Sequence, residues 1–173
     1  MKAFQEGGES LDDFRDYVER YARDLSRFCY KLCGNPHDAE DLFQDTWTKA
    51  LDKYGKFDSS KSFKSWLFAI CVNTYKNAGK LKYNSARIDF PTAEENERFL
   101  SSLPDTQPDV DSRLDLCAAI ASLPKKHRIV ITLYYFREFS RGETAQILDI
   151  PEGTVSSRLA AAKKLLKRRL YLE

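Results

Sequence analysis

The sequence predicts an all-α protein made of two small helical domains joined by a flexible linker. In several segments apolar residues recur at steps of three and four, which is the pattern of amphipathic helices. No segment of useful length alternates between apolar and polar residues, so no sheet is expected. Residues 84–111 contain three prolines, are acidic and lack a helical pattern. We interpret them as a linker between an N-terminal domain at residues 10–83 and a C-terminal domain at residues 112–173.

Length and composition limit the possible classes of protein. A chain of 173 residues makes one ordinary domain or two small ones, and 42% hydrophobic residues are too many for a disordered chain. The four cysteines occur without a signal peptide, which favours reduced thiols over disulfides. No run of apolar residues reaches the roughly 18 that would span a bilayer. We therefore expect a cytoplasmic protein with no membrane insertion of its own.

Three helices are expected in the N-terminal domain. Phe14 to Leu32 carry the apolar stripe of the first helix, and Gly34 is a plausible stop for it. Asn35 and Pro36 supply an N-cap and a first-turn proline for a second helix that runs to about Tyr54. The expected core-facing residues of this second helix are Ala39, Leu42, Phe43, Thr46, Trp47, Ala50 and Leu51. Ser59 or Ser60 is expected to cap a third helix, whose inner residues are Phe63, Trp66, Leu67, Ile70 and Thr74.

The C-terminal domain contains a predicted helix-turn-helix. One helix is expected to end before Pro124, and the next contains Ile129 to Phe136. In the segment SRGETAQILDIPEGTVSSRL, a short helix from about Arg141 to Leu148 precedes a tight break and a longer basic helix from about Glu152. Ser140 and Glu143 have the spacing of a capping box on the short helix, and Asp149 stands near the usual place of the turn glycine.

The formal net charge of +2 conceals a sorted distribution of charges. Residues 35–45 carry four acids and no Lys or Arg, whereas residues 61–83 carry five lysines, no acids and several interleaved aromatics. Residues 84–112 are again acidic, and residues 153–173 are basic. A solvated helix face explains any one block, but four blocks of alternating sign indicate surfaces with separate functions.

Three segments of the chain, in this order, resemble a bacterial RNA polymerase sigma factor of the sigma-70 superfamily, in its extracytoplasmic-function (ECF, group 4) type. DAEDLFQDTWTKAL at residues 38–51 is similar to the segment that docks on RNA polymerase. SFKSWLFAICVNTYKN at residues 62–77 is similar to the segment that opens and reads the −10 promoter element. LPKKHRIVITLYYFREFSRGETAQILDIPEGTVSSRL at residues 123–159 is similar to the domain that reads the −35 element. The resemblance equates the two domains with sigma regions 2 and 4.

The resemblance implies a dissociable specificity subunit with no cofactor and no enzymatic activity of its own. Such a factor binds the beta-prime clamp and the beta subunit of core RNA polymerase, recognises promoter DNA and melts the −10 region, and an anti-sigma factor commonly holds it inactive. The expected polymerase-docking residues are Asp41, Leu42, Gln44 and Asp45. The alternative, compensation of the helix dipole at its positive end, explains Asp38 and Glu40 well but explains Asp45 poorly.

Two further sets of residues are expected to bind DNA. Lysines follow phosphates, and aromatic or amide groups hold unstacked bases, so the resemblance assigns Asn73 to a flipped −10 base and the following loop to its pocket. Trp66 is the open case, because an aromatic residue at helical spacing is more often core. The −10 set is Lys61, Lys64, Trp66, Asn73, Lys76, Asn77, Lys80 and Lys82. The −35 set is Arg141, Thr154, Ser156, Ser157, Arg158, Lys163 and Lys164, with readout that leans on DNA shape and backbone contacts.

The sequence favours a sigma factor over two other classes of protein and over a metal or redox site. A helix-turn-helix regulator of the response-regulator type would need an α/β receiver, and the N-terminal half shows no strand pattern. An enzyme is disfavoured because the sequence has no glycine-rich phosphate loop or nucleophile elbow and only two histidines. Cys29, Cys33 and His37 are spaced for one helical face, but Gly34 and Pro36 interrupt the helix, so a metal or redox site is not expected.

Overall fold

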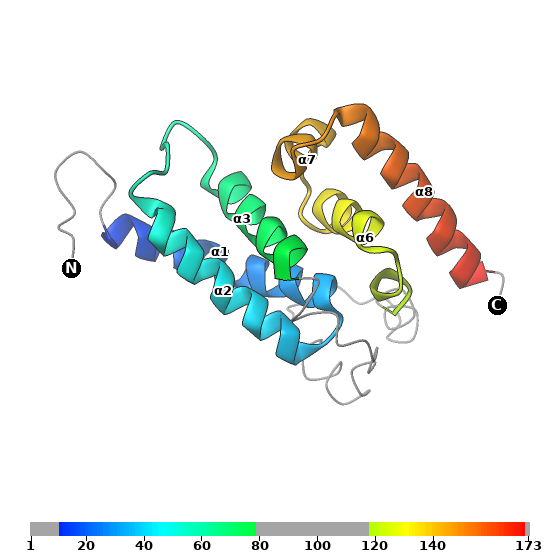
Figure 1. Ribbon diagram of the computed structural model, residues 1–173, viewed down its shortest axis with the longest axis horizontal. Helices are drawn as coiled ribbons and strands as arrows, with labels where there is room; N and C mark the ends of the chain where they lie inside the picture. Colours follow the sequence, from blue (N-terminus) through cyan, green and yellow to red (C-terminus); the bar gives the residue numbers. More distant parts are fainter. Residues whose placement is uncertain (1–10, 79–117, 172–173) are drawn as a thin grey trace.

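The structure is a computed structural model that describes residues 11–78 and 118–171, and every regular element in these residues is helical. The all-α prediction is therefore confirmed for the described residues. The N-terminal domain contains α1 (Leu11–Cys33), α2 (Pro36–Tyr54) and α3 (Phe63–Ala78). The C-terminal domain contains α6 (Lys125–Ile131), the π-helical turn η1 (Thr132–Phe136), α7 (Arg141–Leu148) and α8 (Glu152–Tyr171). In Figure 1, α1 and α2 lie side by side, α3 lies between them and α7, and α8 runs along the far edge.

The junction of α1 and α2 follows the local signals in the sequence. Gly34 has a φ of +78°, which suits glycine, and its N–H donates to the carbonyl of Tyr30 at 2.8 Å. The next residue, Asn35, accepts a hydrogen bond from the N–H of Asp38 at 2.8 Å, and Pro36 occupies the first turn of α2. The predicted end of the first helix and start of the second are confirmed.

The predicted cap of the third helix is wrong by two or three residues. The Asp58 carboxylate accepts hydrogen bonds from the N–H and the hydroxyl of Ser60, at 3.1 and 2.7 Å, and so holds Ser60 in the preceding turn. The Ser62 hydroxyl instead accepts from the N–H of Ser65 at 3.3 Å, directly before the helix begins at Phe63. Three serines near this junction could cap the helix. Because Ser60 is hydrogen-bonded to Asp58 in the turn, Ser62 lies at the start of the helix.

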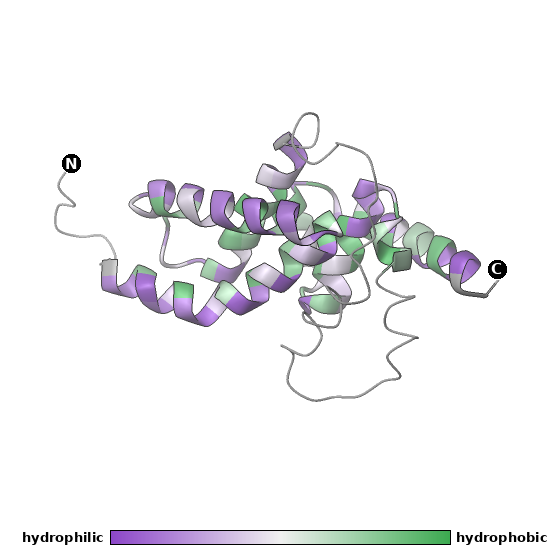
Figure 2. Cartoon of the chain, turned by 90° about the horizontal axis from the view of Figure 1, so that it is seen from below, coloured by the Kyte–Doolittle hydropathy of each residue, from purple (hydrophilic) through white to green (hydrophobic). Residues whose placement is uncertain are grey.

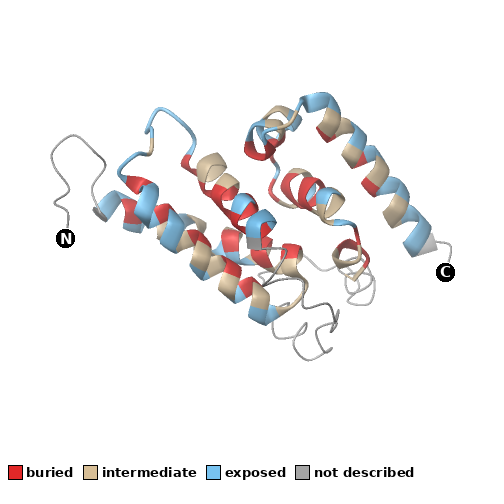
Figure 3. Ribbon diagram, viewed as in Figure 1, coloured by how far each residue is buried: buried red, intermediate tan, exposed pale blue. Residues whose placement is uncertain are grey.

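The core of the N-terminal domain lies between the facing sides of its three helices. Figures 2 and 3 show apolar, buried residues on those sides and polar, exposed ones outside. Tyr17 of α1 stacks on Phe63 of α3 with ring centroids 3.9 Å apart. One predicted core residue is misplaced, since Leu51 is 43% exposed. The fully buried large residues of this core are Leu25, Phe28, Leu32, Leu42, Leu67, Phe68 and Val72.

The helix-turn-helix is formed by α7 and α8 as predicted. Ser140 and Glu143 form both hydrogen bonds of the capping box, at 2.8 and 3.1 Å. Asp149 has a φ of +53°, so it takes the left-handed conformation that glycine usually provides in this turn. Val155 on the inner face of α8 is completely buried. The turn geometry is therefore met without a glycine.

The two domains also pack against each other, which the linker interpretation did not predict. Their buried residues form one continuous hydrophobic cluster. Phe68 of α3 and Phe139, which precedes α7, meet with ring centroids 5.3 Å apart. The turn at Gly34 approaches the C-terminal domain so closely that a Cβ atom there would lie 3.4 Å from the Cβ of Ala121.

Helix α2 offers a matched pair for a stability test. Leu42→Ala leaves a cavity where the side chain is fully buried, so we expect a loss of about 2–5 kcal/mol in the free energy of unfolding. Leu51→Ala on the same helix removes a side chain that is 43% exposed and is expected to cost under about 1 kcal/mol. Urea denaturation followed by circular dichroism measures both. Equal losses would contradict the described core.

Candidate functional site

The acidic surface of α2 is formed by side chains that share one helical face. Asp41, Gln44 and Asp45 are separated by three and four positions, so they point the same way. Gln44 is exposed, and its amide donates to the Glu40 carboxylate at 2.8 Å. Asp41 is half-buried and lies 3.9 Å from the exposed imidazole of His37. These three side chains present carboxylate and amide groups to solvent, as expected for a polar docking surface.

The acidic surface of α2 includes Leu51 but not Leu42. The prediction included Leu42, but its side chain is fully buried and a partner cannot reach it in this conformation. Leu51 lies seven residues after Gln44 on the same face and is exposed. Sequence reasoning missed Leu51 because it fits the apolar stripe by spacing. Asp38 is accounted for locally, since its carboxylate accepts from the side-chain amide of Asn35 at 2.9 Å.

The outer face of α3 carries the predicted base-contacting residues. Asn73 and Asn77 are exposed, and Trp66, seven residues before Asn73, lies on the same face. Trp66 is half-buried because its ring packs against those of Phe57 and Phe63, with centroid distances of 4.8 and 5.3 Å. Its indole therefore supports the core with one side and borders the Asn73 face with the other.

The predicted lysines of the −10 set are distributed over different surfaces. Lys61 is exposed and pairs with Asp58 at 3.6 Å. Lys76 is also exposed, and its ammonium lies 3.5 Å from the carbonyl of Leu148. Lys64 lies about half a turn away from Asn73 around the helix and donates to the carbonyl of Arg137 at 3.1 Å, in the contact between the domains. The structure does not bring Lys64 to the Asn73 face. Lys80 and Lys82 lie outside the described residues.

The segment after Asn73 is helical and not a loop as far as Ala78. Tyr75 is buried, and its hydroxyl donates to the carbonyl of Leu32 at 2.8 Å. Burial is the main cause that raises the pKa of Tyr75 to about 12. Sequence reasoning missed one cation beside this face, because Lys49 belongs to the acidic helix. Its ammonium donates to the hydroxyl of Thr74 at 3.3 Å, next to Asn73.

The predicted −35 residues on α8 divide between two faces. Thr154, Ser157, Arg158 and Lys164 recur at helical spacing and share one face. Ser156 and Lys163 share another, where the Lys163 ammonium lies 5.2 Å from the ring centroid of exposed Tyr135.

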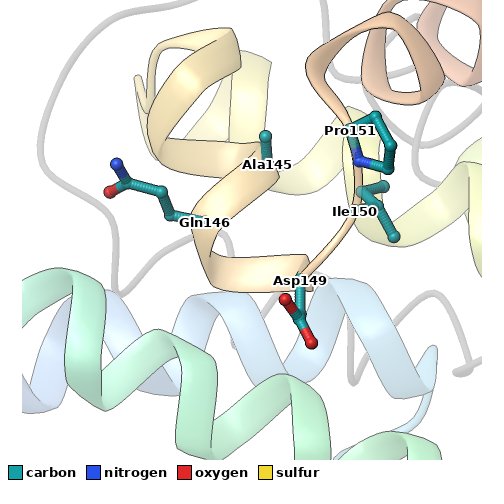
Figure 4. Close-up of a pocket in the computed structure, with 5 residues that line it drawn as sticks. All are labelled: Ala145, Gln146, Asp149, Ile150 and Pro151. Atoms are coloured by element: carbon teal, nitrogen blue, oxygen red, sulfur yellow. The ribbon is translucent and has the colours of Figure 1, made fainter.

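Arg141 is exposed at the start of α7, and a hollow lies at the other end of that helix. The residues lining the hollow are Ala145, Gln146, Asp149, Ile150 and Pro151, and Figure 4 shows Gln146 directed away from Ile150 and Pro151. None of the predicted DNA-contacting side chains lines this hollow, so it belongs to the turn of the motif.

Two of the four cysteines form a buried pair. Cys29 and Cys71 have their sulfur atoms 3.7 Å apart in the core, and burial raises the pKa of the Cys29 thiol, which favours the neutral form. No group of three or more His, Cys, Asp or Glu side chains in residues 11–78 and 118–171 is placed to hold a metal ion. In the same part of the chain, none of the helices combines the length and apolar character needed to cross a bilayer.

Comparison with known proteins assigns both domains to one family. The model of Sigma-70 region 2 matches residues 17–80, and the model of Sigma-70 region 4 matches residues 113–166. The ECF RNA polymerase sigma factor SigW of Bacillus subtilis is 30% identical over 167 residues, which cover 92% of this chain and 89% of SigW. The chain belongs to the sigma-70 family, in its ECF group. A second ECF sigma factor of B. subtilis, SigM, is 27% identical over 88% of this chain and 91% of its own.

Two solved structures share the fold. The sigma factor RpoE of Bartonella quintana, solved with the anti-sigma factor NepR, has a TM-score of 0.72 at 24% identity, covering 93% of this chain and 98% of RpoE. CnrH, solved with the cytosolic domain of CnrY, has a TM-score of 0.71 at 22% identity, covering 95% and 91% of the two chains. The region 2 and region 4 domains of this sigma factor thus have the fold of their relatives.

The buried hydroxyl of Tyr75 predicts a specific alkaline instability. Because burial raises its pKa from 10.0 to about 12, the folded chain holds this proton more tightly than the unfolded chain does. The resulting stabilisation, about 3 kcal/mol, is complete below pH 10 and is lost as the pH rises to 12. Tyr75→Phe lacks this contribution, so its free energy of unfolding should fall less steeply than that of the wild type. Tyr135→Phe, at an exposed position, is the control, and its free energy of unfolding should fall with pH as steeply as that of the wild type. If the wild type and Tyr75→Phe lose stability equally steeply between pH 10 and 12, the assignment is contradicted.

Proposed function

We propose that this chain is a bacterial, cytoplasmic sigma factor that binds core RNA polymerase and directs transcription from promoters with −10 and −35 elements. Polymerase performs the chemistry, and the sigma factor supplies specificity. The observation that carries the proposal is the succession of a region 2 and a region 4 match on one chain whose described residues form both expected DNA-facing elements. Residues 10–83 and 112–173 are the proposed domains, and residues 84–111 are the proposed tether.

The acidic face of α2 is the proposed docking surface for the beta-prime clamp. Asp41, Gln44 and Asp45 lie on one side of a stable helix, so their geometry is fixed before the partner arrives. Exposed Leu51 adds an apolar contact on the same face. A charged patch with one apolar anchor suits a basic partner surface, because charge steers the encounter and the apolar group stabilises the complex.

The outer face of α3 is the proposed site for the melted −10 strand. Asn73 is placed to hydrogen-bond the edge of an unstacked base, and the exposed side of Trp66 borders the same face. Lys49 of α2 and Lys76 of α3 supply ammonium groups near this face. They follow phosphates, while the asparagine carries base recognition.

The N-terminal half of α8 is the proposed reader of the −35 element. Thr154, Ser157 and Arg158 share the face that a major groove would receive, and Lys164 continues it along the helix. Arg158 is the only one of Thr154, Ser157 and Arg158 with a long cationic side chain, so direct contacts to base edges are few. Readout then depends on DNA shape and phosphate contacts.

An inhibitor protein is also part of the proposal. RpoE of B. quintana was solved with the anti-sigma factor NepR, and CnrH with the cytosolic domain of CnrY. The fold that this chain shares with both supports regulation by a protein of the same kind, which would hold the sigma factor away from polymerase until a signal releases it.

Charge reversal on α2 tests the docking surface. Asp41→Lys should weaken binding to core RNA polymerase about tenfold, because a like charge then faces the proposed basic partner surface. Asp16→Lys makes the same change at an exposed position on α1 and should leave the affinity near that of the wild type. Biolayer interferometry with immobilised core polymerase measures all three proteins. Equal weakening by both variants would argue against a defined docking face.

Removal of the Asn73 amide separates promoter opening from polymerase binding. With core polymerase on genomic promoter fragments, the wild-type chain should produce specific run-off transcripts. Asn73→Ala should reduce them about tenfold, since one base contact is worth about 1–3 kcal/mol, while its affinity for core polymerase is unchanged. A parallel loss of core binding would mean that the base pocket is misplaced. No specific transcript from the wild type on any fragment would contradict the proposed function.

A further inference from the structure

Tyr135 is an exposed aromatic residue that has no part in the proposed function. It is 46% exposed, whereas Leu133 in the same π-helical turn η1 is completely buried. In residues 11–78 and 118–171, the other exposed large hydrophobic residue is Leu51, which belongs to the proposed docking surface. A single exposed aromatic residue is ordinary by itself, so its neighbours decide whether it has a function.

Two neighbours hold the ring of Tyr135 in place. The ammonium of Lys163 on α8 lies 5.2 Å from the centroid of this ring, which is within the range of a cation–π contact. The ring of Tyr134 meets it edge to face, with ring centroids 4.9 Å apart and an interplanar angle of 78°. Because Lys163 is otherwise exposed, the ring restricts a long side chain before any ligand arrives. The entropic cost of binding a ligand there is thereby reduced.

The backbone of η1 determines the direction of Tyr135. A π-helical turn is wider than an α-helical one, so Tyr135 points in a different direction from the one it would have in a continuation of α6. At the start of this turn, the hydroxyl of Thr132 is buried and donates to the carbonyl of Arg128 at 2.8 Å. Single π-helical turns occur frequently at functional sites. The position of Tyr135 beside α8 thus depends on an uncommon backbone conformation.

Lys163 lies on the flank of α8, well behind the first turn of this helix. It directly follows Ala162, which is completely buried, and lies on the side of α8 that faces η1. It is nine residues after Thr154, which corresponds to about 14 Å along the helix axis. The major groove is about 8.5 Å deep. When the first residues of α8 reach the base edges, Lys163 therefore lies at the level of the phosphates.

The surroundings of the pair favour an anionic partner. Between residues 156 and 167, α8 carries four basic residues and no acid. The ammonium of lysine and the hydroxyl of tyrosine are both hydrogen-bond donors, and both contact DNA phosphates in known complexes. An acidic protein surface would also match this charge, but the position beside the groove favours DNA. The four basic residues are Arg158, Lys163, Lys164 and Lys167.

We propose that Tyr135 and Lys163 form a phosphate clamp that holds the DNA backbone beside the −35 element. The inference rests on the proposed function and deepens it, because it adds a DNA contact on the face of α8 that carries Ser156. Lys163 supplies the charge, while Tyr135 donates its hydroxyl to the phosphate and keeps the ammonium in place. The contact strengthens binding without reading the sequence, which compensates for the small number of contacts to base edges.

Salt dependence of DNA binding tests the charge of the clamp. Core polymerase carrying the full chain is titrated with a genomic promoter fragment on which the wild type directs run-off transcription, between about 50 and 200 mM KCl. Lys163→Gln removes one phosphate contact, so the slope of log affinity against log salt should become shallower by about 0.9. Arg169→Gln makes the same change of charge at an exposed position on α8 that is rotated by about 120° from Lys163. This control should keep the slope of the wild type.

Two substitutions of Tyr135 separate its hydroxyl from its ring. Tyr135→Phe keeps the ring under Lys163 and loses one neutral hydrogen bond, so it should weaken promoter binding about threefold with an unchanged salt slope. Tyr135→Leu also loses the cation–π contact and should weaken binding about tenfold. Because the contact is to phosphate, each variant should lose the same factor on a fragment whose bases around −35 are replaced. Affinity for core polymerase should equal that of the wild type in every case.

The outcomes distinguish the clamp from the proposed function. If the wild type directs transcription but the Tyr135 and Lys163 variants bind the promoter as Arg169→Gln does, the clamp is refuted and the proposed function stands. A loss of affinity for core polymerase would show that this surface binds protein and not DNA. A loss confined to the fragment with the original −35 bases would show that the pair reads bases and does not hold a phosphate. If the wild type neither binds core polymerase nor directs transcription, the proposed function fails, and the clamp fails with it.

Discussion

The division of the surface of α3 among three neighbours is the constraint on which the rest of the structure depends. Phe63, Leu67 and Ile70 face the core that α3 shares with α1 and α2. Lys64 faces the C-terminal domain, Phe68 lies between Phe28 of α1 and Phe139 of that domain, and Asn73 is exposed. Because successive residues are rotated by about 100°, these assignments are linked, and a shift of one position would move every one of them.

Helix boundaries were predictable where the determinants are local. Asn35 and Pro36 define the start of α2, and Ser140 with Glu143 defines the start of α7, because each signal acts within four residues. The cap of α3 was misassigned because Asp58 sequesters Ser60, a choice between competing side chains. Leu51 was misassigned because its position relative to the other helices depends on packing and not on spacing.

The candidate surfaces were only partly predictable from charge. The acidic block on α2 and the exposed asparagines of α3 lie where the sequence placed them, and the lysine block does not act as one unit. Lys64 belongs to the domain interface and Lys61 to a turn, while Lys49 joins the α3 surface from the acidic helix. Contacts between residues far apart in the sequence decide this distribution. The same holds for Arg128 and Arg137, which donate hydrogen bonds to Leu32 and Asp24 of the N-terminal domain.

Melting of the −10 region is the central claim, and permanganate footprinting tests it most directly, because the reagent oxidises unpaired thymines in the promoter. With core polymerase and the wild-type chain, thymines of the −10 element should become reactive, and they should stay protected with core polymerase alone. Full protection in a complex that still contains both polymerase and the chain would contradict the account.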